Sequence, residues 1–201
     1  MLTKISRKRR ITLALVAAII PLIASSCGYN RMVSLEEGVN SAWGQVENVY
    51  QRRMDLIPNL VETVKGYAAQ EQDTLTEVTE ARARAGGVMN VDEDLLNNPE
   101  AFARFQQAQN SLGSALQRLL VVTENYPDLK SNQNFLALQD QLEGTENRIA
   151  VERMRYNEAV RDYNTLIRRF PQMFIARITG FEEKSYFESS AGAETAPTVE
   201  F

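Results

Sequence analysis

The 201-residue sequence contains no histidine and a single cysteine, Cys27. Histidine is the commonest metal ligand and the usual base of catalytic triads, so its absence excludes histidine-ligated metals and histidine-dependent triads. One cysteine excludes a disulfide within the chain. Six prolines and ten glycines are too few for a β-sandwich or barrel, which needs frequent turns. These absences remove several large classes of enzymes and secreted domains.

Sequence motifs for phosphate binding and nucleophilic catalysis are also missing. The chain has no GxxxxGK[ST], no GxGxxG and no GxSxG, and without histidine it cannot supply the Glu-x-x-His pairs of a di-iron bundle. Residues 92–94 (DED) lack the glycine and the distal glutamate of a calcium loop. We therefore expect neither a catalytic motif nor a cofactor.

Charge is distributed unevenly along the chain. Residues 1–27 hold five of the 22 bases and no acid, which leaves 17 bases against 26 acids in the remainder. Nucleic-acid-binding domains need basic patches that neutralise phosphates, so a body with a net charge of −9 predicts that nucleic acid is not a partner.

The first 27 residues have the pattern of a targeting segment. Five basic residues lie between Lys4 and Arg10 inclusive, and no acidic residue lies among them. Residues 11–26, which are almost wholly apolar or small, follow. The run is shorter than the roughly 20 residues that span a bilayer as a helix. Small residues lead into Cys27, and this stretch resembles a bacterial lipoprotein signal peptide. The resemblance implies that Cys27 carries a lipid and that residues 1–26 are removed.

An uncleaved signal anchor is the alternative for the same segment. Both alternatives tether the body to a membrane, on the periplasmic or extracytoplasmic side, because the basic end stays in the cytoplasm. We divide the remainder into a tether (27–33), a helical bundle (34–188) and a small, polar, disordered tail (189–201).

From Ser34 onward, apolar residues recur every three or four positions, which predicts helices. Ser34 and Glu37 fit a capping box at the start of the first helix, and Pro58 is expected to kink this helix. A break at Pro58 into two helices, giving four in all, is the alternative. Asn98-Pro99 and Ser131 predict the starts of the second and third helices.

Strand signals are missing, so we predict an all-α antiparallel bundle of three long helices plus a short C-terminal helix ended by Gly180. The short helix includes Phe174 and Ile178 and follows Arg168-Arg169. We expect it to cap the end of the bundle, and lying on a membrane is the alternative.

Polar residues interrupt the apolar stripes at a few positions. Arg53 stands where the first stripe requires an apolar residue. It is expected to extend to the surface or to pair with an acid on a facing helix, such as Glu152, and a contact with a partner is the alternative. Glu143 and Glu146 are the carboxylates on which a cell-wall-acting enzyme would depend. Trp43, Tyr156-Asn157 and Tyr163-Asn164 are expected to pack between helices, with the asparagines fixing helix register.

These segments resemble the LemA family over nearly all of residues 29–188. The resemblance rests on Tyr29-Asn30, Ala42-Trp43, residues 52–61 (RRMDLIPNLV), 64–68 (VKGYA), 78–83 (VTEARA) and 155–160 (RYNEAV), Tyr163-Asn164, Phe170-Pro171, Gly180-Phe181 and residues 186–188 (YFE). It implies a bacterial membrane-associated helical bundle without an established enzymatic activity.

We therefore predict a non-enzymatic, membrane-tethered scaffold or interaction module at the cell envelope. Arg52, Arg53, Asp55 and Asn59 are the candidate contacts for an envelope protein partner. An enzyme acting on cell-wall material and a self-assembling coiled-coil protein are the alternative functions.

Overall fold

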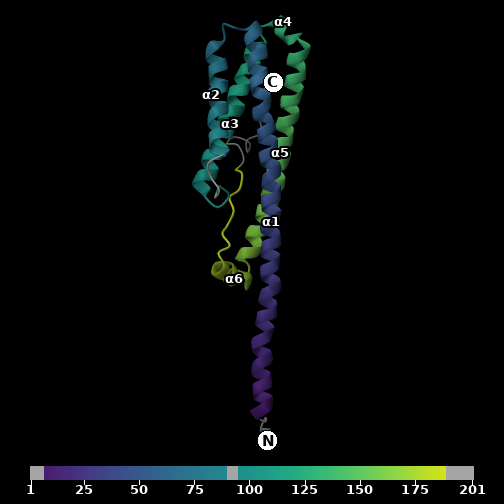
Figure 1. Ribbon diagram of the computed structural model, residues 1–201, viewed down its shortest axis with the longest axis vertical. Helices are drawn as coiled ribbons and strands as arrows, with labels where there is room; N and C mark the ends of the chain where they lie inside the picture. Colours follow the sequence, from purple (N-terminus) through teal and green to yellow (C-terminus); the bar gives the residue numbers. More distant parts are fainter. Residues whose placement is uncertain (1–6, 90–94, 189–201) are drawn as a thin grey trace, which may run out of the picture. The chain divides into compact units, whose positions relative to one another are not determined.

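The computed structural model describes residues 7–89 and 95–188, with side chains from Gly28 onward. It contains six helices in the described ranges: α1 (Arg7–Tyr67), α2 (Gln72–Met89), α3 (Pro99–Thr123), α4 (Pro127–Lys130), α5 (Gln133–Arg168) and α6 (Gln172–Thr179). No strand occurs in those ranges, so the predicted all-α class is confirmed (Figure 1).

The chain forms two compact units. Unit 1 comprises Met1–Ser41 and Ala159–Glu183, and unit 2 comprises Ala42–Glu158 and Lys184–Phe201. Helices α1 and α5 each contribute one part to unit 1 and another part to unit 2. Each unit has buried apolar residues of its own.

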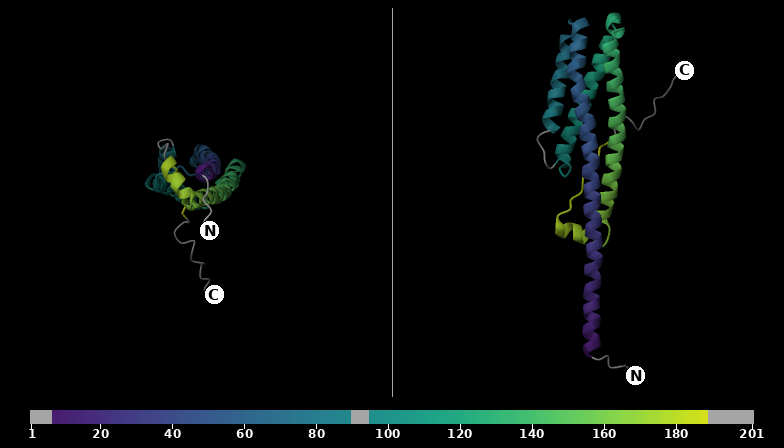
Figure 2. Two further views of the ribbon diagram at one scale, coloured as in Figure 1. Left: turned by 90° about the horizontal axis from the view of Figure 1, so that it is seen from below. Right: turned by 45° about the vertical axis from the view of Figure 1, so that its right-hand side comes forward.

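Unit 2 is a four-helix arrangement of α2, α3 and the adjoining parts of α1 and α5, which lie side by side in Figures 1 and 2. Inter-helix side-chain pairs show that α1 runs antiparallel to α5 and that α2 runs antiparallel to α3. These pairs are Tyr50 with Arg153 and Tyr67 with Asn132 for α1 and α5, and Glu71 with Tyr126 and Glu77 with Arg118 for α2 and α3. The predicted apolar stripes face inward, as buried Ile57, Leu112 and Phe135 illustrate.

Helix α1 continues through Pro58, so the alternative of two helices separated there is wrong. Proline lacks the N–H that would bond to the carbonyl four residues earlier, which is that of Met54. Arg82 of α2 donates its Nε–H to this carbonyl oxygen at 2.9 Å. A guanidinium from the neighbouring helix thus replaces the missing backbone donor.

The chain reverses instead at residues 68–71, between α1 and α2. This turn contains no glycine, proline or asparagine. Buried Ala68 and Leu75 are seven residues apart, which is also the spacing of two turns of a continuous helix. The apolar pattern in the sequence therefore shows no break at the chain reversal. A fourth long helix therefore forms, at a position that the sequence pattern does not mark.

Two of the predicted helix starts need correction. Helix α1 already includes Ser34, so the capping-box prediction there is wrong, because the upstream residues are helical too. At α5 the cap is Asn132, whose side-chain oxygen accepts from the backbone N–H groups of Asn134 and Phe135 at 2.9 and 3.1 Å. The predicted cap of α3 is confirmed, since Asn98 accepts from Glu100 and Ala101.

Several predictions concern parts of the chain that the structure does not describe. Residues 92–94 and the tail 189–201 lie outside the described residues, as do the first six residues of the predicted signal segment. The side chain of Cys27 also lies outside them. Across the part of the chain that is described, no helix has the length and apolar composition needed to cross a membrane.

In unit 1, α6 packs against α1. A Cβ atom placed on buried Gly28 would lie 3.6 Å from both Gln172 Cγ and Ile175 Cδ1. Gly180 ends α6 in the left-handed conformation (φ 81°), as the sequence predicts. The apolar stripe of α5 stays buried to Ile167, whereas Phe170 is exposed.

Candidate functional site

Arg53 lies inside unit 2, with 3% of its surface exposed. Its Nη1 donates to the two carboxylate oxygens of Glu146 at 3.0 and 3.3 Å. Its Nη2 donates to the Gln109 backbone carbonyl at 3.2 Å and also to the Gln109 side-chain oxygen. The guanidinium also sits over the Tyr50 ring at 5.0 Å. The ion pair that the sequence predicts is therefore present, but its acid is Glu146 rather than Glu152.

This network leaves buried donors without acceptors. Because Arg53 donates to the side-chain oxygen of Gln109, the amide orientation is fixed and its Nε2 points elsewhere. Among the described residues, neither Gln109 Nε2 nor Arg53 Nε has a hydrogen-bond partner. The site is polar, charged and incompletely satisfied within an otherwise apolar interior.

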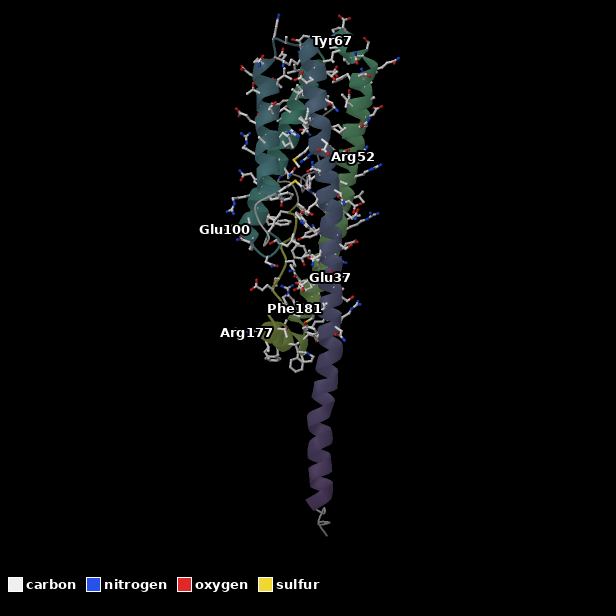
Figure 3. The ribbon with its side chains drawn as sticks, viewed as in Figure 1. Glu37, Arg52, Tyr67, Glu100, Arg177 and Phe181 are labelled. Atoms are coloured by element: carbon white, nitrogen blue, oxygen red, sulfur yellow. The ribbon has the colours of Figure 1, made fainter. Side chains whose placement is uncertain are left out.

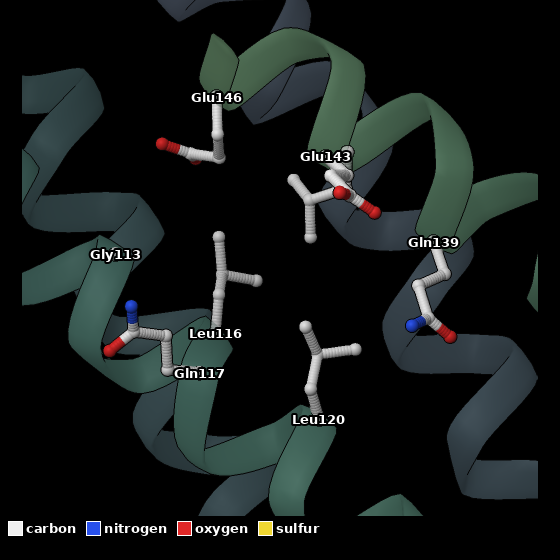
Figure 4. Close-up of a pocket in the computed structure, with 8 residues that line it drawn as sticks. Gly113, Leu116, Gln117, Leu120, Gln139, Glu143 and Glu146 are labelled. Carbon is white, nitrogen blue, oxygen red and sulfur yellow. The ribbon is translucent and has the colours of Figure 1, made fainter. Parts of the chain in front are cut away.

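Two adjoining cavities of about 390 and 330 Å³ lie between α3 and α5, beside Arg53. The first is polar, and the second is lined by three leucines together with polar and acidic side chains (Figure 4). Gly113, Gln117 and Glu146 line both. Together they form a groove, which we name the α3/α5 groove.

Glu143 and Glu146 both line the second cavity. Their carboxylates point in different directions in Figure 4, and Glu146 is paired with Arg53. Catalysis by two carboxylates requires both groups to flank one bond. The arrangement does not provide that geometry, so nothing in it favours the predicted alternative of a cell-wall-acting enzyme.

The other three predicted contact residues are exposed on the outside of α1. Arg52, Asp55 and Asn59 follow one another at intervals of three and four, which places them along one helix face. Gln51 donates to Asp55 at 2.7 Å, and Figure 3 labels Arg52. We name Arg52, Asp55 and Asn59 the α1 stripe. The structure thus separates Arg53 from the residues with which the sequence groups it.

A short C-terminal segment, residues 184–188, is bound to unit 2 through its backbone. The Asn157 side chain donates to the Phe187 carbonyl and accepts from the Phe187 N–H, both at 2.9 Å. Gln106 forms the same two bonds with Glu188, at 2.9 and 3.2 Å. Tyr156 donates to the Ser185 carbonyl at 3.0 Å. We name residues 184–188 the strap.

The Phe187 ring fills an aromatic cluster in unit 2. It stacks on Trp43 with ring centroids 6.1 Å apart, and the Arg153 guanidinium lies over the Phe187 ring, 4.8 Å from its centroid. The cluster also contains Phe102, Phe105 and Tyr156. The predicted packing of Trp43 between helices is confirmed. The role of Asn157 differs from the prediction, because this asparagine binds the strap backbone.

Burial raises the pKa of the Tyr50 and Tyr156 hydroxyls above the usual value, because desolvation disfavours the phenolate. At Tyr50, the nearby guanidinium of Arg153 opposes this effect. The folded chain therefore keeps these protons at a pH where the unfolded chain has begun to lose them.

The free energy of unfolding is expected to be independent of these tyrosines below about pH 10 and to fall as the pH rises further, by at most about 1.4 kcal/mol per pH unit for each group. Denaturant titrations between about pH 9 and 12 measure the slope. Tyr156→Phe should make the slope shallower, and an unchanged slope would contradict the assignment.

No group of three or more acidic or cysteine side chains suitable for a metal ion occurs among the described residues. The sequence did not indicate the strap or the α3/α5 groove. The signal that could have indicated the groove is Gln109, a polar residue in the apolar stripe of the second predicted helix.

Comparison with known proteins relates the chain to one family. The model of the LemA family matches residues 42–201. Magnetosome protein MamQ of Magnetospirillum gryphiswaldense is 28% identical over 198 residues, which cover 91% of this chain and 72% of that protein. Magnetosome protein MamQ 2 of Paramagnetospirillum magneticum is 29% identical with the same coverage. Protein LemA of Metamycoplasma hominis is 20% identical over 161 residues, covering 80% of this chain and 69% of that protein.

Proposed function

The chain belongs to the LemA family, and on this premise we propose that it is a non-enzymatic, membrane-tethered interaction module of the bacterial cell envelope. In this proposal the helical units present a surface to an envelope protein, and the N-terminal segment holds them at the membrane. The names of the relatives reported above state no enzymatic activity.

The division of residues 52–59 between two environments carries this proposal. Arg53 faces inward and is bonded to Glu146 and Gln109, so a role inside unit 2 accounts for it. Arg52 and Asn59 are exposed, and their side chains take no part in hydrogen bonds or ion pairs among the described residues. Polar and charged side chains that are exposed on a helix and take no part in internal bonding suit recognition of a partner.

The tether is proposed from the sequence. Lipid attached to Cys27 after removal of residues 1–26, or an uncleaved signal anchor, would hold residues 27–33 at the membrane surface. A single acyl chain gives only marginal membrane binding, whereas several chains give stable anchoring. The partner would then meet the bundle on the extracytoplasmic side of the membrane.

Photocrosslinking in cells tests the proposed partner contact. A photoreactive residue at Gln51, which is exposed beside Arg52 and Asp55, is expected to capture one dominant envelope protein. The matched control is the same residue at Val121, a position on α3 whose side chain is 69% exposed. Adducts are identified by mass spectrometry.

The outcomes separate the alternatives. One envelope protein captured at Gln51 but not at Val121 supports the interaction module. Adducts only between copies of the chain would favour self-assembly over a heterologous partner. Absence of any adduct at Gln51 from abundant, folded protein would overturn the assignment of the α1 stripe as the contact surface.

A further inference from the structure

The apolar residues around α6 are the most exposed large hydrophobic side chains among those of unit 1 that the structure describes. Phe170 is 79% exposed and Ile178 is 85% exposed, and Phe174 and Met173 are 55% and 46% exposed. Phe174 and Ile178 are four residues apart on α6 and share one helix face, and the Phe170 ring, in the turn before α6, lies 6.0 Å from the Phe174 ring. Within unit 1 these side chains are exposed rather than packed.

The opposite face of α6 already has its packing partners. Ala176 is buried, and Ile175 lies against Gly28 of α1. The exposed face is therefore not the face through which α6 packs against α1. We name Phe170, Met173, Phe174 and Ile178 the α6 patch. In Figure 3, side chains extend from this part of unit 1, where Arg177 and Phe181 are labelled.

The charge around the α6 patch has the sign opposite to that of the body. Residues 168–179 contain three arginines, Arg168, Arg169 and Arg177, and no acid. The rest of residues 28–201 contains 14 bases and 26 acids. Two of these acids are close by, since Glu182 and Glu183 follow the helix and Glu183 lies 3.7 Å from Arg168. Even with both counted, the segment keeps a net positive charge.

Helix α6 lies beside the residues that directly follow the N-terminal targeting segment. Helix α6 packs on Gly28, which directly follows Cys27 and the apolar run 11–26. Within unit 1, α1 continues past α6 toward Arg7 (Figure 1). The patch is thus placed where the chain emerges from its proposed membrane anchor, whether that anchor is a lipid or the apolar run.

We propose that the α6 patch binds the surface of the membrane to which the chain is tethered, with its apolar side chains at the boundary between headgroups and acyl chains. Arg168, Arg169 and Arg177 would contact anionic headgroups. Exposed apolar side chains next to basic ones are the pattern of an interfacial helix, and their place beside the proposed anchor favours the membrane surface as the partner. The proposal rests on the proposed tether and adds a second contact with the membrane.

An environment-sensitive fluorophore on the full chain tests this contact. Ile178→Cys is labelled with a thiol-reactive NBD dye, and the protein is reconstituted into vesicles of phosphatidylcholine with or without phosphatidylglycerol. We expect NBD emission at position 178 to rise and shift to the blue, and to be quenched by nitroxide-bearing lipid. Both effects should be larger in the anionic vesicles.

Two controls accompany this measurement. Val121→Cys carries the dye at an exposed apolar position of unit 2. The unsubstituted chain, treated with the dye, reports any labelling of Cys27. Replacing Arg168, Arg169 and Arg177 together with glutamine should reduce the quenching at position 178 in anionic vesicles to the level in neutral ones.

Flotation of the same samples separates this inference from the proposed function. If the protein floats with the vesicles but the dye at position 178 shows the same emission and quenching as the dye at position 121, the membrane contact of the patch is overturned and the tether remains intact. If the dye at position 178 has blue-shifted emission but is not quenched by nitroxide-bearing lipid, the patch lies against a protein surface, such as a second copy. This result would also overturn the membrane contact. Protein that does not float would contradict the tether itself.

Discussion

Glu146→Ala is expected to lower the free energy of unfolding of unit 2 by about 3 kcal/mol, because the substitution leaves Arg53 charged and buried without its carboxylate. Loss of one partner of a buried ion pair costs roughly 3–5 kcal/mol. We expect the lower end of this range, since the Glu146 side chain is 43% exposed while that of Arg53 is 4% exposed. Denaturant unfolding followed by circular dichroism measures the change.

The control is Glu143→Ala, which removes an exposed acid three residues away on the same helix. It should change the free energy of unfolding by less than about 0.5 kcal/mol. Combining Glu146→Leu with Arg53→Met should recover much of the stability, because an apolar pair of similar volume avoids the buried charge. Equal and small effects of Glu146→Ala and Glu143→Ala would show that Arg53 does not depend on its carboxylate.

Phe187→Ala is expected to release the strap and to expose Trp43. The buried ring contacts Trp43, Phe102 and Tyr156, so its loss should cost about 3 kcal/mol of local stability. Trp43 is the only tryptophan of the chain, and its side chain is largely buried. Its fluorescence emission should therefore shift to longer wavelength, and amide hydrogen exchange should accelerate at Phe187 and Glu188.

Tyr186→Ala is the matched control, because Tyr186 is next in the chain and is 40% exposed. This variant should keep the native tryptophan emission and the slow exchange. An unchanged Trp43 spectrum in Phe187→Ala would mean that the strap does not cover the tryptophan in solution.

The buried faces of the helices could be predicted from the sequence because burial follows helical periodicity. The three- and four-residue spacing of apolar residues along α3 also takes in polar Gln109 and Thr123, and both are buried. Periodicity places a residue on a helix face whatever its polarity, so the pattern also marked Arg53 as an inward-facing residue.

Other features depend on which residues meet across helices, and spacing along one helix does not contain that information. Glu146 and Glu152 lie six residues apart, or about 9 Å along the α5 axis. Only the register between α1 and α5 selects Glu146 as the partner of Arg53. The turn at residues 68–71 was missed for a similar reason, since Ala68 and Leu75 preserve the apolar spacing across it. The continuity of α1 at Pro58 depends on Arg82, which comes from another helix.

The strap also depends on contacts between elements that are distant in the sequence, and the residue types alone do not reveal these contacts. Nothing in an asparagine on α5 or a glutamine on α3 indicates that both will bind backbone groups near the C-terminus. The functional assignment was limited in the same way, because the sequence grouped Arg52 and Arg53 although their side chains face opposite environments.

The hydrogen bonds of the strap have a consequence for how this segment can vary. Asn157 and Gln106 bind only N–H and C=O groups, which every residue except proline provides alike. Positions 186 and 188 should therefore accept many side chains, whereas proline at 187 or 188 should not be accepted. Because Phe187 must reach its aromatic cluster, insertion or deletion of one residue between Lys184 and Phe187 should be more harmful than most substitutions. Evolution can thus change the composition of this segment more freely than its length.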